Sequence, residues 1–489
     1  MFGLASNLPG ACNRRELLLR AGSGFGALAL AWLGVRDGWA GPSDAAGGVA
    51  AGSGPHAHPL APRPPHFAAR AQSVIWLFLD GGPSHIDLFD PKPELNRLAG
   101  QPLPPSVPRP VTAMGRTANT PLLPSKRSFQ QHGQAGLWIS DWYPHLARHA
   151  DELAVVRSCY ADGLNHVGSV CQMNTGSILG GKPSLGAWCV YGLGSEADNL
   201  PAFVVLADYP EDPPGGGRNW GTGFMPAQYQ GTRLRDGPQP ILHLAPPADQ
   251  SPASLRRKLD LIQALNARHQ ALRPDEDQLT ARMAAYELAW RMQRDAPEAI
   301  DLSAETAHTH QRYGLDQEET RRLGQCCLLA RRLVERGVRF VQIYCGSGSK
   351  WDAHKDVEGN HARRCLESDR PFAGLIADLK NRGLLESTLV VWGGEFGRTP
   401  MSESGDGRDH NPWGFTVWLA GGGVRGGIAY GATDELGLYA LEPRVHVRDL
   451  HATILHLLGL DHERLVWPHN GLDERLTGTG GRVIHELIG

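Results

Sequence analysis

Short runs of uninterrupted apolar residues recur along the chain, and longer segments with helical periodicity separate them. The runs cover residues 73–79, 153–156, 203–206, 338–344, 387–392 and 415–419. Continuous apolar runs of this length are typical of strands buried on both faces of a parallel sheet. Helices are predicted over residues 254–272, 277–294, 317–335, 365–384 and 447–458. Strands that alternate with helices indicate an α/β fold, with a doubly wound, mostly parallel sheet flanked by helices.

The pattern changes between residues 249 and 335, where polar helical sequence is long and strand signals are few. We interpret this stretch as a helical insertion within one domain that covers residues 72–489. The stretch from 91 to about 136 is rich in proline and is expected to form loops.

The first residues have the pattern of an export signal. Arg14 and Arg15 precede an apolar run over 21–33, and small residues follow near Ala40. This run is too short to span a bilayer, which takes about 20 residues. We therefore expect residues 1–40 to be a removable signal of the twin-arginine type, with the twin-arginine export machinery as a partner. Residues 41–71 are predicted to be a flexible linker.

Composition narrows the possible functions. Lys and Arg (48) nearly balance Asp and Glu (51) across 489 residues, which gives a net charge of −3. A chain this close to neutrality does not favour nucleic-acid binding. With the signal removed, we expect a periplasmic or secreted protein without a membrane span.

Carboxylates and imidazoles follow the predicted strands at several separate places. Asp80 comes directly after the first run, and Glu395 follows the run over 387–392. Other candidate ligands are found in two loops: Asp352, His354, Asp409 and His410. Ligands in open α/β sheets bind beyond the carboxyl ends of the strands, so these side chains are expected to meet. Oxygen and imidazole ligands predict a divalent cation, which could be Zn, Mn, Mg or Ca.

Each candidate also has a structural interpretation that the residues alone leave open. Asp80 before two glycines could form an Asx-turn, and Asp352 and His354 could be exposed loop residues. Glu395 could form a salt bridge with Arg398.

Several motifs together resemble a bacterial family of exported proteins of unknown function, family 1501, which is similar in fold to alkaline phosphatases and sulfatases. The matching segments span nearly the whole chain after residue 12: 13–17, 78–87, 165–166, 175–176, 285–289, 351–354, 394–400, 407–410 and 449–453.

The resemblance implies a phosphatase-like site with two metal ions or a sulfatase-like site with one. Asp80 and Glu395 would then bind one ion, and Asp352, His354 and His410 would bind the other. Arg398 would hold an oxygen pair of a phosphate or sulfate group.

The position of the nucleophile departs from the family pattern. Sulfatases have Cys or Ser nine residues before a Thr-Gly pair, and here that position before Thr175 is His166. His166 could be a covalent nucleophile, a metal ligand or an inert replacement. Phosphatases would have His where this chain has Phe396, which puts a second metal ion in doubt.

The sequence therefore predicts an exported, metal-dependent hydrolase of phosphate or sulfate esters. The expected partner is an anionic small molecule or a sulfated or phosphorylated glycan. The alternative is a catalytically inactive binding protein that retains the sulfatase-like fold.

Overall fold

The computed structural model describes residues 60–489 except 116, 236–239, 242–250 and 274–276. The predicted export signal and most of the predicted linker therefore lie outside the described residues. The strands of the described chain are β1 Ser73–Leu79, β2 Phe129–His132, β3 Leu137–Ser140, β4 Leu153–Tyr160, β5 Phe203–Ala207, β6 Thr232–Arg233, β7 Phe340–Cys345, β8 Thr388–Gly393, β9 Gly397–Glu403, β10 Gly407–Asn411, β11 Phe415–Ala420, β12 Ile428–Tyr430, β13 Val445–His446, β14 Trp467–His469 and β15 Leu472–Glu474.

A nine-stranded sheet forms the centre of the fold, with the order β12-β4-β11-β8-β1-β7-β5-β6 and β13 paired to β4. β1 pairs in parallel with both β7 and β8, and β5 continues the parallel part. β11 runs antiparallel to β8 and β4. The prediction of a mostly parallel α/β sheet is confirmed, and all the predicted apolar runs form strands of this sheet.

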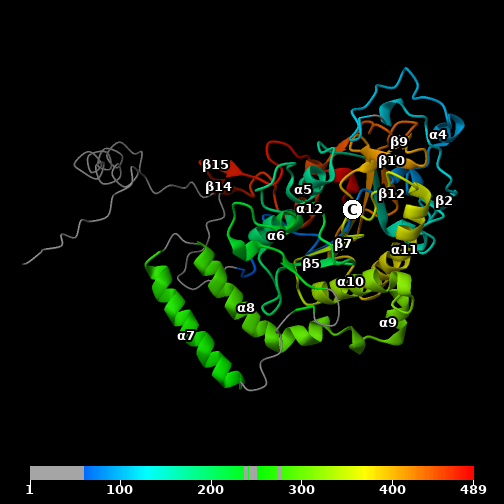
Figure 1. Ribbon diagram of the computed structural model, residues 1–489. Helices are drawn as coiled ribbons and strands as arrows, with labels where there is room; N and C mark the ends of the chain where they lie inside the picture. Colours follow the sequence, from blue (N-terminus) through cyan, green and yellow to red (C-terminus); the bar gives the residue numbers. More distant parts are fainter. Residues whose placement is uncertain (1–59, 116, 236–239, 242–250, 274–276) are drawn as a thin grey trace, which may run out of the picture. The chain divides into compact units, whose positions relative to one another are not determined.

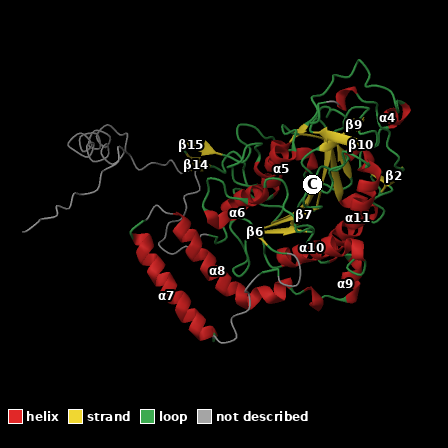
Figure 2. Cartoon of the chain, viewed as in Figure 1, coloured by secondary structure: helices red, strands yellow, loops and turns green. Residues whose placement is uncertain are grey.

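The helices are α3 His85–Leu88, α4 Pro93–Arg97, α5 His166–Thr175, α6 Leu185–Leu193, α7 Pro252–Ala271, α8 Asp277–Ile300, α9 Ala307–Arg312, α10 Glu318–Glu335, α11 Val357–Asn381 and α12 Val447–Leu457. They cover both faces of the sheet (Figure 2). Alternate side chains of β1 point to opposite faces: Ile75 and Leu77 pack with residues of α10 and α11, whereas Trp76 and Phe78 pack with residues of α5, α6 and α12.

The predicted helical insertion contains two kinds of helix. α7 and α8 run side by side at the periphery (Figure 1), and no residue of α7 is buried. α10 is different, because Leu323, Leu328 and Leu333 are buried in the core beneath the sheet. The structure thus places α10 among the helices that flank the sheet.

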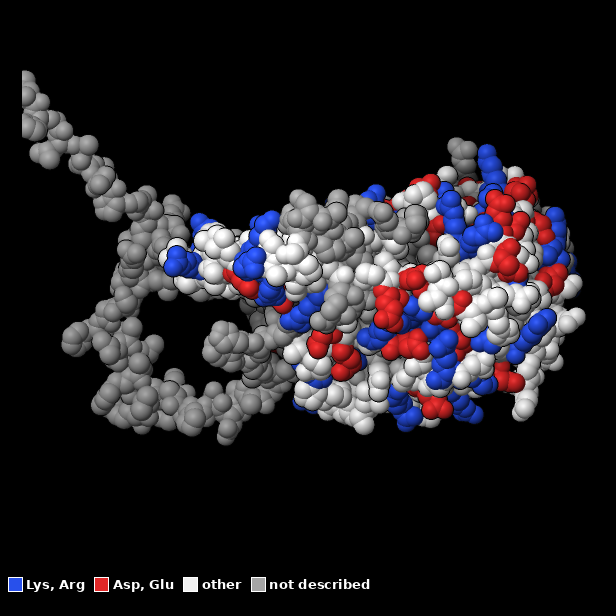
Figure 3. All heavy atoms as spheres, turned by 90° about the horizontal axis from the view of Figure 1, so that it is seen from below, with Lys and Arg blue, Asp and Glu red and all other residues white. Residues whose placement is uncertain are grey.

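β9 and β10 form an antiparallel hairpin beyond the carboxyl end of β8, with His410 opposite Arg398. Sequence analysis did not predict this hairpin. In the described part of the chain, no helix combines the length and apolar character needed to cross a bilayer. Figure 3 shows acidic and basic side chains interspersed over most of the face it presents.

Candidate functional site

The carboxyl ends of β1, β7 and β8 bring three carboxylates to one edge of the sheet. Asp80 directly follows β1, and Asp352 lies in the loop after β7. Glu395 follows β8 and accepts a hydrogen bond from the Gly81 amide at 3.0 Å. Gly81 has φ +117°, and a Cβ atom on it would lie 2.4 Å from the Asp352 amide nitrogen. A glycine therefore allows the end of β1 to approach the Asp352 loop this closely.

Helix α5 adds His166 from a different part of the chain. Asn165 is the N-cap of α5, and its side chain accepts a hydrogen bond from the Gly168 amide. His166 is thereby the first residue of the helix. Its Nδ1 lies 2.8 Å from Glu395 Oε1, so α5 is joined to the end of β8.

The imidazoles of His166, His354 and His410 share one arrangement. In each ring Nδ1 contacts an oxygen atom: that of Glu395, of Glu403 and of the Leu164 carbonyl, respectively. The Leu164 carbonyl can only accept, so Nδ1 of His410 carries a proton. If the other two rings also donate through Nδ1, each neutral imidazole has its lone pair on Nε2.

All three Nε2 atoms lie around Asp352. The distances to its carboxylate oxygens are 3.2 Å from His166, 3.1 Å from His354 and 3.6 Å from His410. The Nε2 atoms of His166 and His410 are buried and make no hydrogen bond. Asp352 and the three histidines each have one ligand atom within 4.8 Å of those of the others. We call His166, Asp352, His354 and His410 the histidine cluster.

A cation fits the histidine cluster. Lone pairs of neutral imidazoles that face a carboxylate repel it unless a proton or a metal ion lies between them. Metal-ligating histidines usually bind through one ring nitrogen and donate the other N–H to a carboxylate or a carbonyl. The Nδ1 contacts of the three rings match this pattern, and the donor set of imidazole nitrogen and carboxylate oxygen suits Zn and similar ions.

The electrostatics of the described residues agree with this fit. Burial alone would lower the pKa of His166, but the carboxylates of Asp352 and Glu395 raise its pKa to about 9. Burial would raise the pKa of Asp352, but His166, His410 and Arg398 hold its pKa far below the usual range. The cluster therefore favours a bound positive charge.

Asp80 and Glu395 form a second acidic location next to the histidine cluster. Asp80 is fully buried, and its Oδ2 accepts hydrogen bonds from the Gly348 and Ser349 amides, both at 2.8 Å. Its Oδ1 has no hydrogen-bond partner. Burial and the Glu395 carboxylate raise the pKa of Asp80 to about 8. A buried carboxylate oxygen without a hydrogen-bond partner is suited to bind a cation.

Arg398 is buried beneath the histidine cluster, where most of its donors are used. It donates to the carbonyls of Gly81, Gly82 and Arg408 and, at 2.7 Å, to Asp352 Oδ1. These bonds fix the end of β1 against the hairpin and hold the Asp352 carboxylate in place. The predicted role of Arg398 as an anion clamp stays a prediction.

Asp409 lies near His354. Its carboxylate accepts hydrogen bonds from the Met114 and His410 amides, and it groups with His354 and Glu403. Sequence analysis missed Glu403, which contacts Nδ1 of His354. Pairing of β9 with β10 brings Glu403 to this position, so only recognition of the hairpin could have revealed it.

The ring of Phe396 closes one side of the cluster. It stacks on His410 with ring centroids 4.2 Å apart and lies 5.2 Å from the ring of His166. Because a phenyl ring has no nitrogen or oxygen atom, Phe396 provides no metal ligand at this position.

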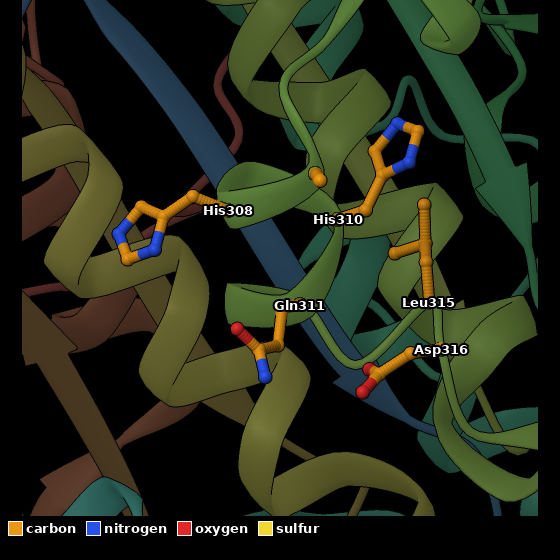
Figure 4. Close-up of a pocket in the computed structure, with 6 residues that line it drawn as sticks. His308, His310, Gln311, Leu315 and Asp316 are labelled. Carbon is orange, nitrogen blue, oxygen red and sulfur yellow. The ribbon is translucent and has the colours of Figure 1, made fainter.

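A cavity of about 510 Å³ at α9 is a different candidate site (Figure 4). The rings of His308 and His310 point away from each other there. His308 contacts Arg312, His310 contacts the Leu302 carbonyl at 2.8 Å, and Asp316 pairs with Arg370. Because these polar groups have partners and do not converge, the cavity is a weaker candidate than the histidine cluster.

Comparison with solved structures returned sulfatase-like and phosphatase-like enzymes at low similarity. A sulfatase, PsFucS1 from Pseudoalteromonas sp., has 12% identity and a TM-score of 0.31, with 83% of this chain and 74% of that chain covered. The TAB5 alkaline phosphatase mutant His 135 Glu has 10% identity and a TM-score of 0.35, with 80% and 99% covered. The phosphonate monoester hydrolase SpPMH from Silicibacter pomeroyi has 12% identity and a TM-score of 0.31, with 65% and 68% covered.

These similarities are too low to support a conclusion about activity. No curated protein matches the chain in sequence. A family model does match, over residues 71–488, which is most of the chain and includes every residue of the histidine cluster. The chain therefore belongs to the family described as "Protein of unknown function (DUF1501)".

Proposed function

We propose that this protein is a metal-dependent hydrolase of phosphate or sulfate esters and that the histidine cluster holds its metal ion. The observation that carries the proposal is the shared orientation of three imidazoles, each with Nδ1 on an oxygen atom and Nε2 toward Asp352. When bound, a divalent ion would polarise the ester group and acidify water. The metal's identity, be it Zn, Mn, Mg or Ca, and the alcohol of the ester are left open.

In this proposal His166 is a metal ligand and not a covalent nucleophile. Its Nδ1 is engaged by Glu395, and its Nε2 faces the same point as the Nε2 atoms of His354 and His410. Glu395 orients this ring, and Glu403 orients the ring of His354. Asp80 lies beside the cluster with a pKa raised to about 8, so a second cation bound there would take the place of its proton.

Metal analysis of the purified full chain tests the binding part of the proposal. We expect about one equivalent of a divalent metal or more after purification without chelators. Asp352→Asn should lower the affinity for that metal by at least about tenfold, because Asn keeps an oxygen for Arg398 but loses the charge. His308→Gln is the matched control, since it changes an imidazole outside the cluster. Wild-type protein with less than about half an equivalent would contradict the proposal.

Turnover of nitrophenyl phosphate and nitrophenyl sulfate tests the catalytic part. We expect metal-dependent turnover that falls by about a hundredfold or more in His166→Asn and Asp80→Asn, because both substitutions alter the metal's surroundings. His308→Gln should retain wild-type activity. Turnover that survives both cluster substitutions would remove this site from the reaction.

A non-catalytic binding protein is the second candidate, and two observations favour it. Phe396 takes a position next to the imidazoles without offering a ligand, and Arg398 has most of its donors engaged within the protein. Such a protein would bind an anionic ligand, such as a sulfated glycan, through the metal. Full metal occupancy with saturable binding of sulfated glycan and no turnover would favour this candidate.

A further inference from the structure

A pocket of about 310 Å³ lies between three helical elements that are distant from one another in the sequence. They are the 3-10 helix η2 Leu146–Glu152, α9 and α11, and both η2 and α9 pack on α11. A Cβ atom on Gly374 of α11 would lie 2.6 Å from the Arg312 carbonyl oxygen, so a glycine allows α9 to approach this closely. The volume is in the range of small-molecule sites. This pocket is not the cavity of Figure 4, although both border α9.

Each of the three elements contributes one arginine to the pocket: Arg148 from η2, Arg312 from α9 and Arg370 from α11. His145 and His149 add two imidazoles. Among the residues that the structure describes, no carboxylate lines the pocket. We call these five residues the arginine pocket. Guanidinium groups gathered around one cavity repel each other, and an anion between them would relieve that repulsion.

The carboxylate that holds Arg312 does not cancel this charge. Arg312 donates to Asp378 at 3.2 Å. Asp378 also pairs with Arg331 at 2.9 Å and with Arg382 at 3.1 Å. One negative charge is therefore shared by three arginines, and the group as a whole stays positive.

Arg370 and Arg148 keep donors for a ligand. Arg370 contacts Asp316 at 3.3 Å through one nitrogen, and its other guanidinium nitrogens have no hydrogen-bond partner in the described chain. Arg148 is exposed and forms no ion pair with a described residue. The nearby carboxylate of Asp369 is buried and accepts hydrogen bonds from two backbone amides. The donors of Arg148 and Arg370 are therefore available to an anion in the pocket.

The two imidazoles can add neutral donors. Burial, together with the charge of Arg148, lowers the pKa of both His145 and His149, so both rings are neutral near pH 7. Neither ring has a hydrogen-bond partner among the described residues. A neutral imidazole carries one N–H, which can donate to an oxygen of a bound anion.

We infer that the arginine pocket binds the tetrahedral oxyanion of a phosphate or sulfate compound. Guanidinium groups bind the oxygens of such groups through charge-assisted hydrogen bonds. Donors that come from three separate elements match oxygens that point in several directions better than the two coplanar oxygens of a carboxylate. α11 begins three residues after His354, and Arg370 lies about 20 Å further along this helix. The pocket is therefore separate from the histidine cluster, and the inference does not depend on the proposed hydrolase activity.

Isothermal titration of the full chain with inorganic phosphate and with sulfate, at constant ionic strength, tests this inference. We expect saturable binding of both anions and much weaker binding of acetate. Arg148→Gln and Arg370→Gln should each weaken phosphate binding by at least about tenfold, because each removes charge-assisted hydrogen bonds. Arg148→Gln should not disturb folding, since Arg148 is exposed and forms no ion pair with a described residue.

Arg363→Gln is the matched control, because Arg363 is also on α11, is 71% exposed and lies outside the pocket. It should bind phosphate like wild type. Asp352→Asn separates the pocket from the histidine cluster: this variant should keep a phosphate site, and adding Arg148→Gln to it should weaken that site. Slower hydrogen exchange of the amides of 146–152 and 307–312 with phosphate is the expected local readout.

Glucose 6-phosphate, titrated into Asp352→Asn protein, distinguishes two sources of the oxyanion. Tighter binding than that of inorganic phosphate would mean that the alcohol of an ester fills the rest of the pocket. Weaker binding would mean that the ligand is the free anion.

The inference is wrong if millimolar phosphate and sulfate show no saturable binding. It is also wrong if the Arg148 and Arg370 variants bind phosphate like wild type and exchange in η2 and α9 stays unchanged. Acetate that binds as tightly as phosphate would contradict the assignment to a tetrahedral group.

Discussion

Gly81 allows the end of β1 to touch the loop that carries Asp352, and this contact predicts a large effect of a single methyl group. Gly81→Ala would force a Cβ to within 2.4 Å of the Asp352 amide at a φ of +117°. We expect a loss of about 3 kcal/mol in the free energy of unfolding, together with weaker metal binding. Urea denaturation and metal titration measure the two effects.

Gly100→Ala provides the matched control for that substitution. Gly100 also has a positive φ, +77°, but a Cβ there meets nothing within 4 Å. Its substitution should cost only about 1 kcal/mol, the backbone contribution alone, and leave metal binding unchanged. Equal losses in the two variants would mean that the close approach at Gly81 has no energetic consequence.

Asp369 gives the stability of the protein a predictable dependence on pH. Its carboxylate accepts hydrogen bonds from the His145 and Leu146 amides, and burial raises its pKa to about 6. Because an unfolded Asp titrates near 3.9, the folded state holds this proton more tightly, and stability falls as pH rises from about 4 to 6. Relative to wild type, Asp369→Asn should therefore gain about 2 kcal/mol over this interval.

Urea denaturation at several pH values between those limits measures this gain. Asn keeps one oxygen for the Leu146 amide, so the substitution should be tolerated at pH 4. A constant difference for Asp369→Asn would contradict the assigned pKa.

At the scale of single residues, the sequence predicted most of the side chains that meet at the site. Asp80, Asp352, His354, Glu395 and His410 were all identified because polar side chains after apolar strands stand out. Glu403 was not identified, because a Glu in a polar segment cannot be distinguished by sequence from an ordinary surface residue. Its partner, His354, is 49 positions away and meets it only through the hairpin.

Among the elements, α10 and α7 differ in what they contribute, although sequence analysis placed both in one insertion. Leu328 on α10 is fully buried in the core, whereas Leu261 on α7 is 62% exposed. Leu328→Ala should cost about 2–5 kcal/mol through lost burial and the cavity left behind. Leu261→Ala, the same chemical change, should cost less than about 0.5 kcal/mol. Similar values for both would mean that α10 is not part of the core.

The accuracy of the predicted elements follows the strength of their apolar signal. The strands β1, β4, β5, β7, β8 and β11 were found within a few residues, because their apolar runs are continuous, whereas the short strands β6, β12 and β13 of the same sheet were not predicted. α11 begins at Val357, earlier than predicted, because Asp356 caps a first turn that is mostly polar. The β9–β10 hairpin was missed since its polar sequence lacks strand-like alternation.

At the scale of the whole molecule, the order of the strands in the sheet determines which site residues become neighbours, and this order cannot be predicted from the sequence. β1, β7 and β8 are distant in the chain but adjacent in the sheet, and only that order brings Asp80, Asp352 and Glu395 to one edge. Periodicity predicts that strands exist and contains no information about their neighbours. The fold class could therefore be predicted, whereas the partners of each site residue needed the structure.

Because the histidine cluster joins segments from α5, the loop after β7 and the β9–β10 hairpin, metal binding should stabilise the molecule as a whole. An ion at about a hundred times its dissociation constant adds about 2.7 kcal/mol to the free energy of unfolding if it binds only the folded chain. Removal by a chelator should then lower the thermal midpoint by about 2–5 °C, and the restored metal should reverse the change. Asp352→Asn should respond less than wild type at the same metal concentration, while His308→Gln should respond like wild type. A midpoint that is the same with chelator and with metal would mean that His166, Asp352 and His410 meet without an ion between them, and a proton shared by His166 would then be what balances the Asp352 carboxylate.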